Sequence, residues 1–158
     1  PPQILRPGFI TDQMLSEVLG EVETDVTILD ANSGQAPKAP GMKYRHYAPD
    51  AELTLVTGKE EAVVQYINDQ ALIKQQLGEK VGVIATTERM NLYQADVIKC
   101  IGSRKDETDI GRHLYRILRE FDDEKVTCIY SEVFDSQGYG QAIMNRLLKA
   151  AGHKVVSV

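Results

Sequence analysis

The sequence predicts an α/β fold with a mostly parallel sheet and helices on both faces, preceded by a domain remnant and an extended linker. Residues 52–57, 81–86 and 126–131 form apolar runs that are typical of strands in a buried parallel sheet. From residue 51 to the C-terminus such runs alternate with segments of helical periodicity, and the connections are short. Together these observations indicate a small Rossmann-like domain over residues 51–158.

Residues 1–30 are expected to be the C-terminal remnant of another domain. Residues 3–10 favour a short strand, and residues 11–19 favour a helix with Thr11 as its N-cap. The apolar face of this helix comprises Met14, Leu15, Val18 and Leu19, and a second apolar run covers residues 26–29. These pieces are too few to bury a core, and the chain opens on Pro1 instead of methionine. We therefore expect a fragment or a processed product.

Residues 31–50 are expected to be a linker. Residues 31–41 consist largely of Gly, Pro and small side chains, which disfavour both helix periodicity and strand pairing. The rest of the segment contains the sequence PGMKYRHYAP, over residues 40–49. We expect an extended backbone here.

Within residues 51–158 the elements follow in order. Thr57 and Glu60 have the spacing of a capping box, which predicts a helix after the first strand. Residues 97–101 predict a shorter strand, and residues 110–121 an amphipathic helix. A closing helix over residues 143–151 ends at Gly152, a natural C′ residue, and residues 154–158 form a last strand. Right-handed crossovers place the helices on both faces of the sheet.

The charge distribution indicates where a ligand would bind. The net charge of −5 argues against broad binding to a nucleic-acid backbone. Residues 1–37 carry six acidic side chains and only Arg6 as a base, whereas residues 38–49 hold cations and no acid. An anionic ligand would therefore bind at residues 38–49. No apolar run approaches the roughly 20 residues that span a bilayer, so no membrane association is expected.

The cysteines and histidines do not indicate a metal site. Cys100 and Cys128 lie in strand-like apolar runs and are expected to be buried free thiols, which favours a reducing, cytoplasmic location. The three histidines are scattered, and His113 and His153 are expected to be surface or core-edge groups.

Residues 43–47 carry the densest group of functional side chains. Alternate side chains of an extended segment face the same way, so Lys43, Arg45 and Tyr47 would project to one side and Tyr44 and His46 to the other. Lys and Arg suit phosphate oxygens, and Tyr can stack on a base. A solvated basic linker that happens to contain aromatic residues is the competing interpretation.

The sequence over residues 40–49 resembles the linker signature of the two-domain threonylcarbamoyl-AMP synthases. Residues 4–8 (ILRPG) are similar to the last strand of that family's catalytic domain, and residues 138–147 (GYGQAIMNRL) to a stretch near its C-terminus. The three matches occur in the right order. The linker match is highly specific, and the other two support it.

The resemblance implies an enzyme that condenses ATP, L-threonine and bicarbonate into threonylcarbamoyl-AMP and releases pyrophosphate, for the modification of tRNA by other proteins. It places ATP, threonine and Mg²⁺ chiefly in the N-terminal catalytic domain, so this fragment alone is expected to be inactive and to hold neither catalytic residues nor a metal. It implies that Arg6 binds the nucleotide. It also implies that the linker residues contact the nucleotide or the intermediate; these are Lys43, Tyr44, Arg45, His46 and Tyr47.

Two rival functions remain open at this stage. One is a stand-alone nucleotide-sensing or protein-interaction module, and the other is a small redox or hydrolytic enzyme. The glycines at 138 and 140 follow a strand and open a helix, but Ile143 occupies the third glycine position of a dinucleotide fingerprint. Structural glycines are therefore expected there, and Asn145 and Arg146 are expected on a helix surface or at a domain interface. The second rival lacks a nucleophile beside a recognisable base. Direct contact with tRNA stays open.

Overall fold

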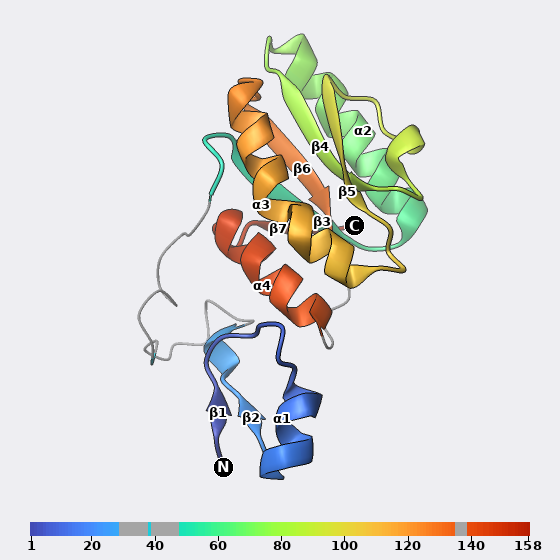
Figure 1. Ribbon diagram of the computed structural model, residues 1–158. Helices are drawn as coiled ribbons and strands as arrows, with labels where there is room; N and C mark the ends of the chain where they lie inside the picture. Colours follow the sequence, from blue (N-terminus) through green and yellow to red (C-terminus); the bar gives the residue numbers. More distant parts are fainter. Residues whose placement is uncertain (29–37, 39–47, 135–138) are drawn as a thin grey trace.

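A five-stranded, fully parallel sheet forms the larger part of the molecule (Figure 1). The computed structural model describes residues 1–28, 38, 48–134 and 139–158. The strands lie in the order β5-β4-β6-β3-β7. Their bounds are β3 Glu52–Thr57, β4 Val81–Thr86, β5 Val97–Gly102, β6 Cys128–Glu132 and β7 Val155–Ser157. The predicted α/β class with a mostly parallel sheet is confirmed.

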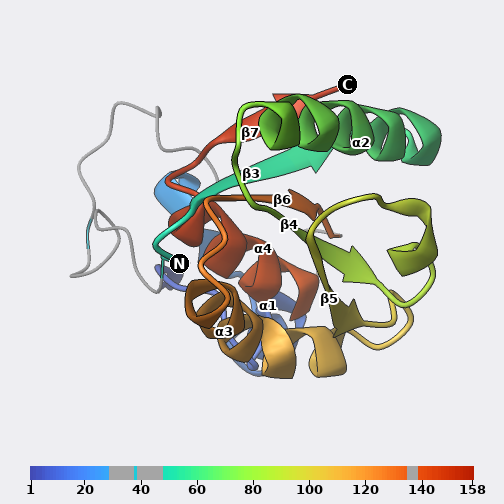
Figure 2. The same ribbon diagram turned by 90° about the horizontal axis from the view of Figure 1, so that it is seen from above.

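Helices cover both faces of the sheet, as predicted (Figure 2). Helix α2 (Glu60–Gln76) lies on one face, and helices α3 (Glu107–Asp123) and α4 (Tyr139–Ala150) lie on the other. The chain progresses outward from β3 through β4 to β5 and then returns to β6 and β7. With right-handed crossovers, this reversal requires the later helices to change face. A short helical turn, η2 (Met90–Leu92), joins β4 to β5.

The core is divided by the sheet into two layers. Successive strand residues point to opposite faces, so Leu53, Leu55 and Ile129 pack against α3 and α4, whereas Val83 and Tyr130 pack toward α2. On α3 and α4 the buried partners are Ile110, Leu114, Ile117, Phe121, Ile143 and Leu147. Burial of apolar side chains on both faces explains why these strands are continuous apolar runs in the sequence.

The N-terminal residues form a separate small sheet below α4 in Figure 1. Strands β1 (Gln3–Ile4) and β2 (Glu23–Thr24) pair in parallel, helix α1 (Asp12–Leu19) joins them, and a helical turn, η1 (Val26–Ile28), follows. Thr11 is the N-cap of α1, as predicted, and its Oγ1 accepts a hydrogen bond from Met14 N at 3.2 Å. The predicted strand over residues 3–10 is much shorter than expected, because β2 offers only two residues to pair with.

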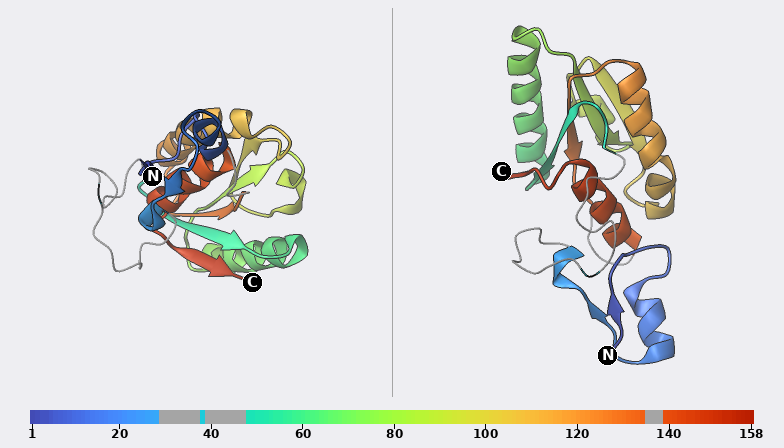
Figure 3. Two further views of the ribbon diagram at one scale, coloured as in Figure 1. Left: turned by 90° about the horizontal axis from the view of Figure 1, so that it is seen from below. Right: turned by 90° about the vertical axis from the view of Figure 1, so that its left-hand side faces the viewer.

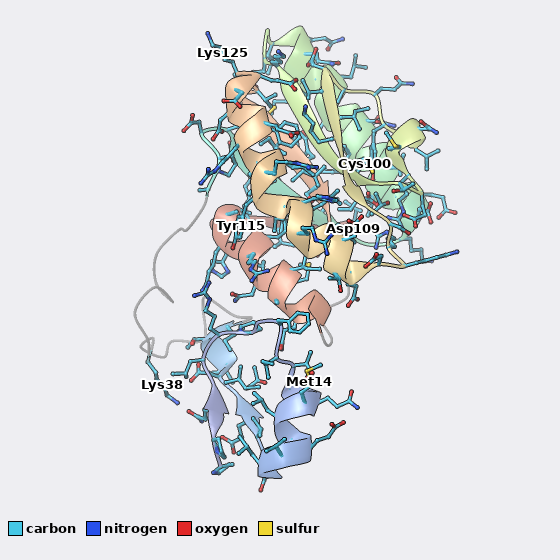
Figure 4. The ribbon with its side chains drawn as sticks, in the orientation of Figure 1. Met14, Lys38, Cys100, Asp109, Tyr115 and Lys125 are labelled. Carbon is cyan, nitrogen blue, oxygen red and sulfur yellow. The ribbon has the colours of Figure 1, made fainter. Side chains whose placement is uncertain are left out.

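Helix α1 has no buried residue although one of its faces is apolar. Met14, Val18 and Leu19 are exposed, and Figure 4 shows Met14 on this helix. The β1–β2 sheet and α1 together are too small to enclose a core. The apolar face agrees with the expectation that residues 1–30 complete a larger domain, which remains a prediction.

Two sequence-based expectations about residues 51–158 are wrong. Thr57 does not cap α2: it is the last residue of β3, its carbonyl accepts a hydrogen bond from Val158 N at 2.9 Å, and Lys59 is the N-cap. Gly58, at a φ of 146°, provides the turn between strand and helix. Cys128 is buried, but Cys100 is only half-buried, because β5 is an edge strand.

The end of α4 agrees with the prediction. Gly152 has a φ of 59°, and His153 N donates a hydrogen bond to Leu148 O at 2.8 Å, so the left-handed residue closes the helix. The turn then leads into β7, which pairs with β3. Among the residues that the structure describes, no helix is long and apolar enough to cross a membrane.

Close contact between α3 and the sheet requires a glycine in β4. A Cβ atom on Gly82 would lie 2.6 Å from Cε1 of Phe121, whose side chain is fully buried. We predict that Gly82→Ala lowers the free energy of unfolding by about 1–3 kcal/mol, because overpacking forces the ring or the helix to move. Urea denaturation measures this change. Gly8→Ala is the control, since a Cβ atom at that position would have no atom within 4 Å, and an unaffected Gly82→Ala would contradict the packing argument.

Candidate functional site

The densest group of predicted site residues lies outside the described part of the chain. Lys43, Tyr44, Arg45, His46 and Tyr47 all belong to residues 39–47, which the structure does not describe. The structure does describe Lys38 before this segment and residues 48–50 after it. It also describes Arg6. The surroundings of Lys38 and of residues 48–50 show how the chain is held on either side of residues 39–47.

Lys38 is tied to the N-terminal sheet (Figure 4). Its Nζ lies 3.1 Å from Oδ2 of Asp25 and donates a hydrogen bond to Oε1 of Gln3 at 2.6 Å. Asp25 follows β2, and Gln3 lies in β1, so a single ammonium group bridges both strands. The Asp25 side chain is 1% exposed, whereas that of Lys38 is 48% exposed, so the carboxylate is buried and the ammonium group keeps contact with solvent. The chain just before residues 39–47 is therefore held by the N-terminal sheet.

Hydrogen bonds from Thr27 hold the Asp25 carboxylate in place beside the Lys38 ammonium group. Thr27 donates two hydrogen bonds to Oδ1 of Asp25, from Oγ1 at 2.6 Å and from its backbone N at 2.9 Å. These bonds, followed by the Lys38 ammonium, lower the pKa of Asp25 to about 2. The carboxylate is therefore charged throughout the physiological pH range.

The other end of the linker rests on α3. The backbone N of Asp50 donates a hydrogen bond to Oδ1 of Asp122 at 2.8 Å. Ala48 and Pro49 line a shallow cleft of about 150 Å³ with side chains of α3, namely Tyr115, Leu118, Arg119 and Asp122. The guanidinium of Arg146 on α4 lies over the Tyr115 ring, 5.7 Å from its centroid. Arg146 therefore joins the two helices beside the place where the linker ends.

Arg6 is exposed in the loop between β1 and α1. Its positive charge contributes to the lowered pKa of Lys149 on α4, although burial of that lysine is the larger cause. Arg6 is therefore near enough to Lys149 for their charges to interact, and the other predicted site residues lie outside the described part of the chain.

A buried contact connects the two sheets. Asn145 on α4 is 4% exposed, and its Nδ2 donates a hydrogen bond to Ile28 O at 3.2 Å. Of the two places expected for Asn145, a helix surface or a domain interface, the structure supports the interface. Figure 3 shows α4 between the five-stranded sheet and the N-terminal elements.

A second polar cluster, which sequence reasoning missed, surrounds Glu132 at the carboxyl end of β6. Glu132 is fully buried, and its Oε1 accepts hydrogen bonds from Arg89 Nη1 at 2.8 Å and from Arg104 Nη2 at 2.9 Å. Its Oε2 accepts from the backbone N of Thr86 at 3.0 Å and from Thr86 Oγ1 at 3.3 Å. One carboxylate at the end of β6 thus holds together residues that end or follow two other strands, β4 and β5.

The Glu132 cluster extends to the start of α2 and to the β5–α3 loop. Arg89 also contacts Glu60 in the first turn of α2, with Nε 3.4 Å from Oε1. Arg104 Nη2 donates to Val133 O at 3.2 Å, and its guanidinium lies over the Phe134 ring, 5.3 Å from the centroid. One sequence signal was available: a glutamate directly ends a buried strand, and such a charge needs partners.

The described residues offer no metal-binding cluster. Among residues 1–28, 38, 48–134 and 139–158, no three His, Cys, Asp or Glu side chains converge as metal ligands would. His113 Nδ1 instead lies 3.4 Å from Asp109 Oδ1, one turn away on α3. His113 is half-buried, in agreement with the core-edge position expected for it.

Comparison with known proteins relates residues 10–152 to the family model described as threonylcarbamoyl-AMP synthase, C-terminal domain. The chain is similar to the threonylcarbamoyl-AMP synthase of Bacillus subtilis, with 42% identity over 98% of this chain, and to that of Pyrococcus abyssi, with 37% identity over the whole chain. It spans only 43% and 44% of the length of these two relatives.

Solved structures show the same relationship. The structure of P. abyssi Sua5 in complex with L-threonine matches the whole chain with a TM-score of 0.84 and 35% identity, and the chain covers 44% of it. A variant of the same protein, with a consecutive His and Tyr replaced by Ala, matches with a TM-score of 0.85. The C-terminal Sua5 domain of Pyrococcus horikoshii matches 70% of this chain over its full length, with a TM-score of 0.57 and 32% identity.

The hydrogen bonds to Asp25 determine its pKa, and this can be tested by substitution. We expect the Asp25 carboxyl to titrate near pH 2, and Thr27→Val to raise its pKa more than Lys38→Met does, because the Thr27 hydroxyl is the largest cause of the low pKa. Since the pKa of the folded protein lies below the ordinary value of 3.8, the stabilisation by Asp25 is present above that value. It is lost as the pH falls toward 2. Carboxyl-carbon NMR measures both values, and a larger effect of Lys38→Met would contradict this ranking.

The buried carboxylate of Glu132 predicts a large stability change. We expect Glu132→Gln to lower the free energy of unfolding by about 3–5 kcal/mol, because two guanidinium groups lose their shared counter-ion. Denaturant unfolding measures this. Glu79→Gln is the matched control: it removes a partly exposed ion pair with Lys74 at 3.5 Å, which is worth at most about 1 kcal/mol. Equal effects of both substitutions would show that the Glu132 cluster is not structurally important.

Proposed function

Because the chain belongs to the threonylcarbamoyl-AMP synthase family and matches its C-terminal domain, we propose that it is the C-terminal part of an enzyme that makes threonylcarbamoyl-AMP. The proposed substrates of the intact protein are ATP, L-threonine and bicarbonate, and pyrophosphate is the second product. The proposed product then passes to other proteins that modify tRNA, and the proposed location is the cytoplasm. The similarity over the whole chain carries this proposal.

The proposed division of the chain follows from its two sheets. Residues 1–30 complete the catalytic domain, residues 31–50 form the linker, and residues 51–158 form the accessory domain. The exposed apolar face of α1 supports the first assignment, since a catalytic domain could cover Met14, Val18 and Leu19. ATP and Mg²⁺ would bind chiefly to the part of the enzyme that precedes this chain, with Arg6 contributing to the nucleotide site.

The linker is proposed to close over the adenylate site, and the two anchors support this role. Ten peptide steps separate Lys38 from Ala48, so the segment between the anchors reaches at most about 35 Å. The Asp25–Lys38 ion pair and the Asp50–Asp122 hydrogen bond therefore restrict where residues 43–47 can lie. A short segment held at both ends loses less conformational entropy on closing than a free one would.

The residue types of the motif fit an adenylate and a polyphosphate. Arg45 and Lys43 would neutralise phosphate oxygens, and this stabilises the charge that develops as pyrophosphate leaves. Tyr44, His46 and Tyr47 would stack on the base or donate hydrogen bonds. An acyl-adenylate hydrolyses readily, so a closed linker that excludes water would also protect the product. The variant structure of the P. abyssi relative changes a consecutive His and Tyr, and the one such pair in this sequence is His46–Tyr47.

A stand-alone nucleotide-sensing or protein-interaction module is the second candidate. It rests on the crystallised P. horikoshii C-terminal domain, which this chain covers completely. A module of this kind would need no linker motif for its activity, and this difference separates it from the leading proposal.

Alanine substitutions in the linker of the intact enzyme test the proposal. We expect Tyr44→Ala and Arg45→Ala each to lower turnover roughly tenfold or more, since one charge-assisted contact is worth about 1.5–3 kcal/mol. The free energy of unfolding should change by no more than about 0.5 kcal/mol. Threonine- and bicarbonate-dependent release of pyrophosphate from ATP measures turnover, and Lys105→Ala, an exposed cation in the β5–α3 loop, is the control. Unchanged turnover in both variants would eliminate the closing role.

A further inference from the structure

A cleft of about 180 Å³ opens at the carboxyl edge of the five-stranded sheet, beside the Glu132 cluster. It is lined by Gly58 and Val63 at the start of α2, by Arg89 and Arg104, and by residues 132–134. Strand β6 leads to α4 on one face of the sheet, whereas its neighbours β3 and β4 continue to the other face, the face of α2. The cleft therefore lies where the direction of the connections reverses, which is where open parallel sheets bind ligands.

The Glu132 cluster contains more buried hydrogen-bond donors than acceptors. Glu132 receives four bonds, from Arg89, Arg104 and twice from Thr86, and this fills its two oxygens. Two buried side-chain atoms in the described part of the chain lack a hydrogen-bond partner, namely Arg104 Nε and the Tyr93 hydroxyl. Both belong to this neighbourhood: Arg104 binds Glu132 directly, and burial, together with the charge of Glu132, raises the pKa of Tyr93.

The more buried charges at the cleft are also unbalanced. They are two guanidinium groups and one carboxylate, because the side chains of Arg89 and Arg104 are 16% and 30% exposed and that of Glu132 is 1% exposed. Two more exposed acids, Glu60 and Glu88, lie beside them. Glu60 contacts Arg89 at 3.4 Å, and Glu88 accepts hydrogen bonds from Ser103 and from the backbone N of Arg104.

The start of α2 adds backbone donors to the same cleft. Gly58 precedes the helix, and the N-cap residue Lys59 makes no side-chain hydrogen bond to the first turn. Free N–H groups at the start of a 17-residue helix favour an anion. Arginine forks, an uncapped helix start and unpaired donors together suit a group with several acceptor oxygens in different directions.

We propose that this cleft is a binding site for a small phosphate-bearing ligand, held by Arg104, Arg89 and the start of α2. The ligand replaces Glu60 at Arg89 and supplies the acceptor that Arg104 Nε lacks. When guanidinium N–H groups of Arg89 or Arg104 turn from Glu132 to the ligand, the Tyr93 hydroxyl donates a hydrogen bond to Glu132 in their place. The site belongs to residues 51–158 and does not depend on the function proposed for the linker.

NMR titration of the 158-residue chain tests this proposal. Inorganic phosphate, pyrophosphate and AMP are added separately at constant ionic strength, with chloride as the non-specific anion. We expect a saturable shift of the Arg104 Nε–H and Gly58 amide signals with at least one of the three probes and none with chloride. The order of affinities then distinguishes a free phosphate from a nucleotide.

Two variants of the cleft and one control variant test which side chains hold the ligand. Arg104→Gln should weaken binding roughly tenfold or more, followed at the Gly58 amide, whereas Arg116→Gln, an exposed arginine on α3, should leave it unchanged. Tyr93→Phe removes a buried hydroxyl that makes no hydrogen bond of ordinary length, so it should preserve thermal stability yet weaken binding about fivefold. If Arg104→Gln does not fold, Tyr93→Phe decides. No saturable shift with any probe, or equal affinity in Tyr93→Phe, overturns the proposal.

Discussion

Burial of the central strand β6 on both faces is the constraint on which the rest of the sheet depends. Its five residues are all buried between β4 and β3, and the last of them is a glutamate. A carboxylate in that position must be paired or strongly destabilise the fold. Arg89 and Arg104 supply the partners from the loops after β4 and β5. A single charge at the end of one strand thus fixes the loops that shape the carboxyl edge.

The two faces of the sheet differ in what they contact. The face of α3 and α4 carries the connections to the N-terminal part, through the Asn145–Ile28 and Asp50–Asp122 hydrogen bonds. The carboxyl edge of the sheet carries Glu132, with Arg89 from the loop after β4 and Arg104 from the loop after β5. The chain before residue 51 thus contacts the α3 and α4 face, and the carboxyl edge of the sheet forms a separate cleft.

The sequence predicted those features that depend on local chemistry. Continuous apolar runs identified β3, β4 and β6, and Thr11 and Gly152 identified two helix ends, because capping involves only neighbouring residues. Thr57 was wrongly predicted to be a helix cap because its strand partner, Ser157, is a hundred residues away in the sequence. Cys100 was wrongly predicted to be buried because the sequence of one strand does not show whether that strand lies at the edge of the sheet. The Glu132 cluster was missed for the same reason: its partners come from the ends of β4 and β5, one or two strand connections before the end of β6. The linker motif could be recognised because its residues are consecutive, and its role stays a prediction because residues 39–47 lie outside the described part of the chain.

In the proposed intact enzyme, a linker anchored at Lys38 and Asp50 closes over an adenylate. Hydrogen exchange of the backbone amides of residues 39–47, measured with and without ATP, L-threonine and bicarbonate, follows this closure. We expect slower exchange when all three substrates are present, and a smaller protection in Asp25→Asn, which loses the charge that holds Lys38. Identical exchange in the presence and absence of substrates would contradict it.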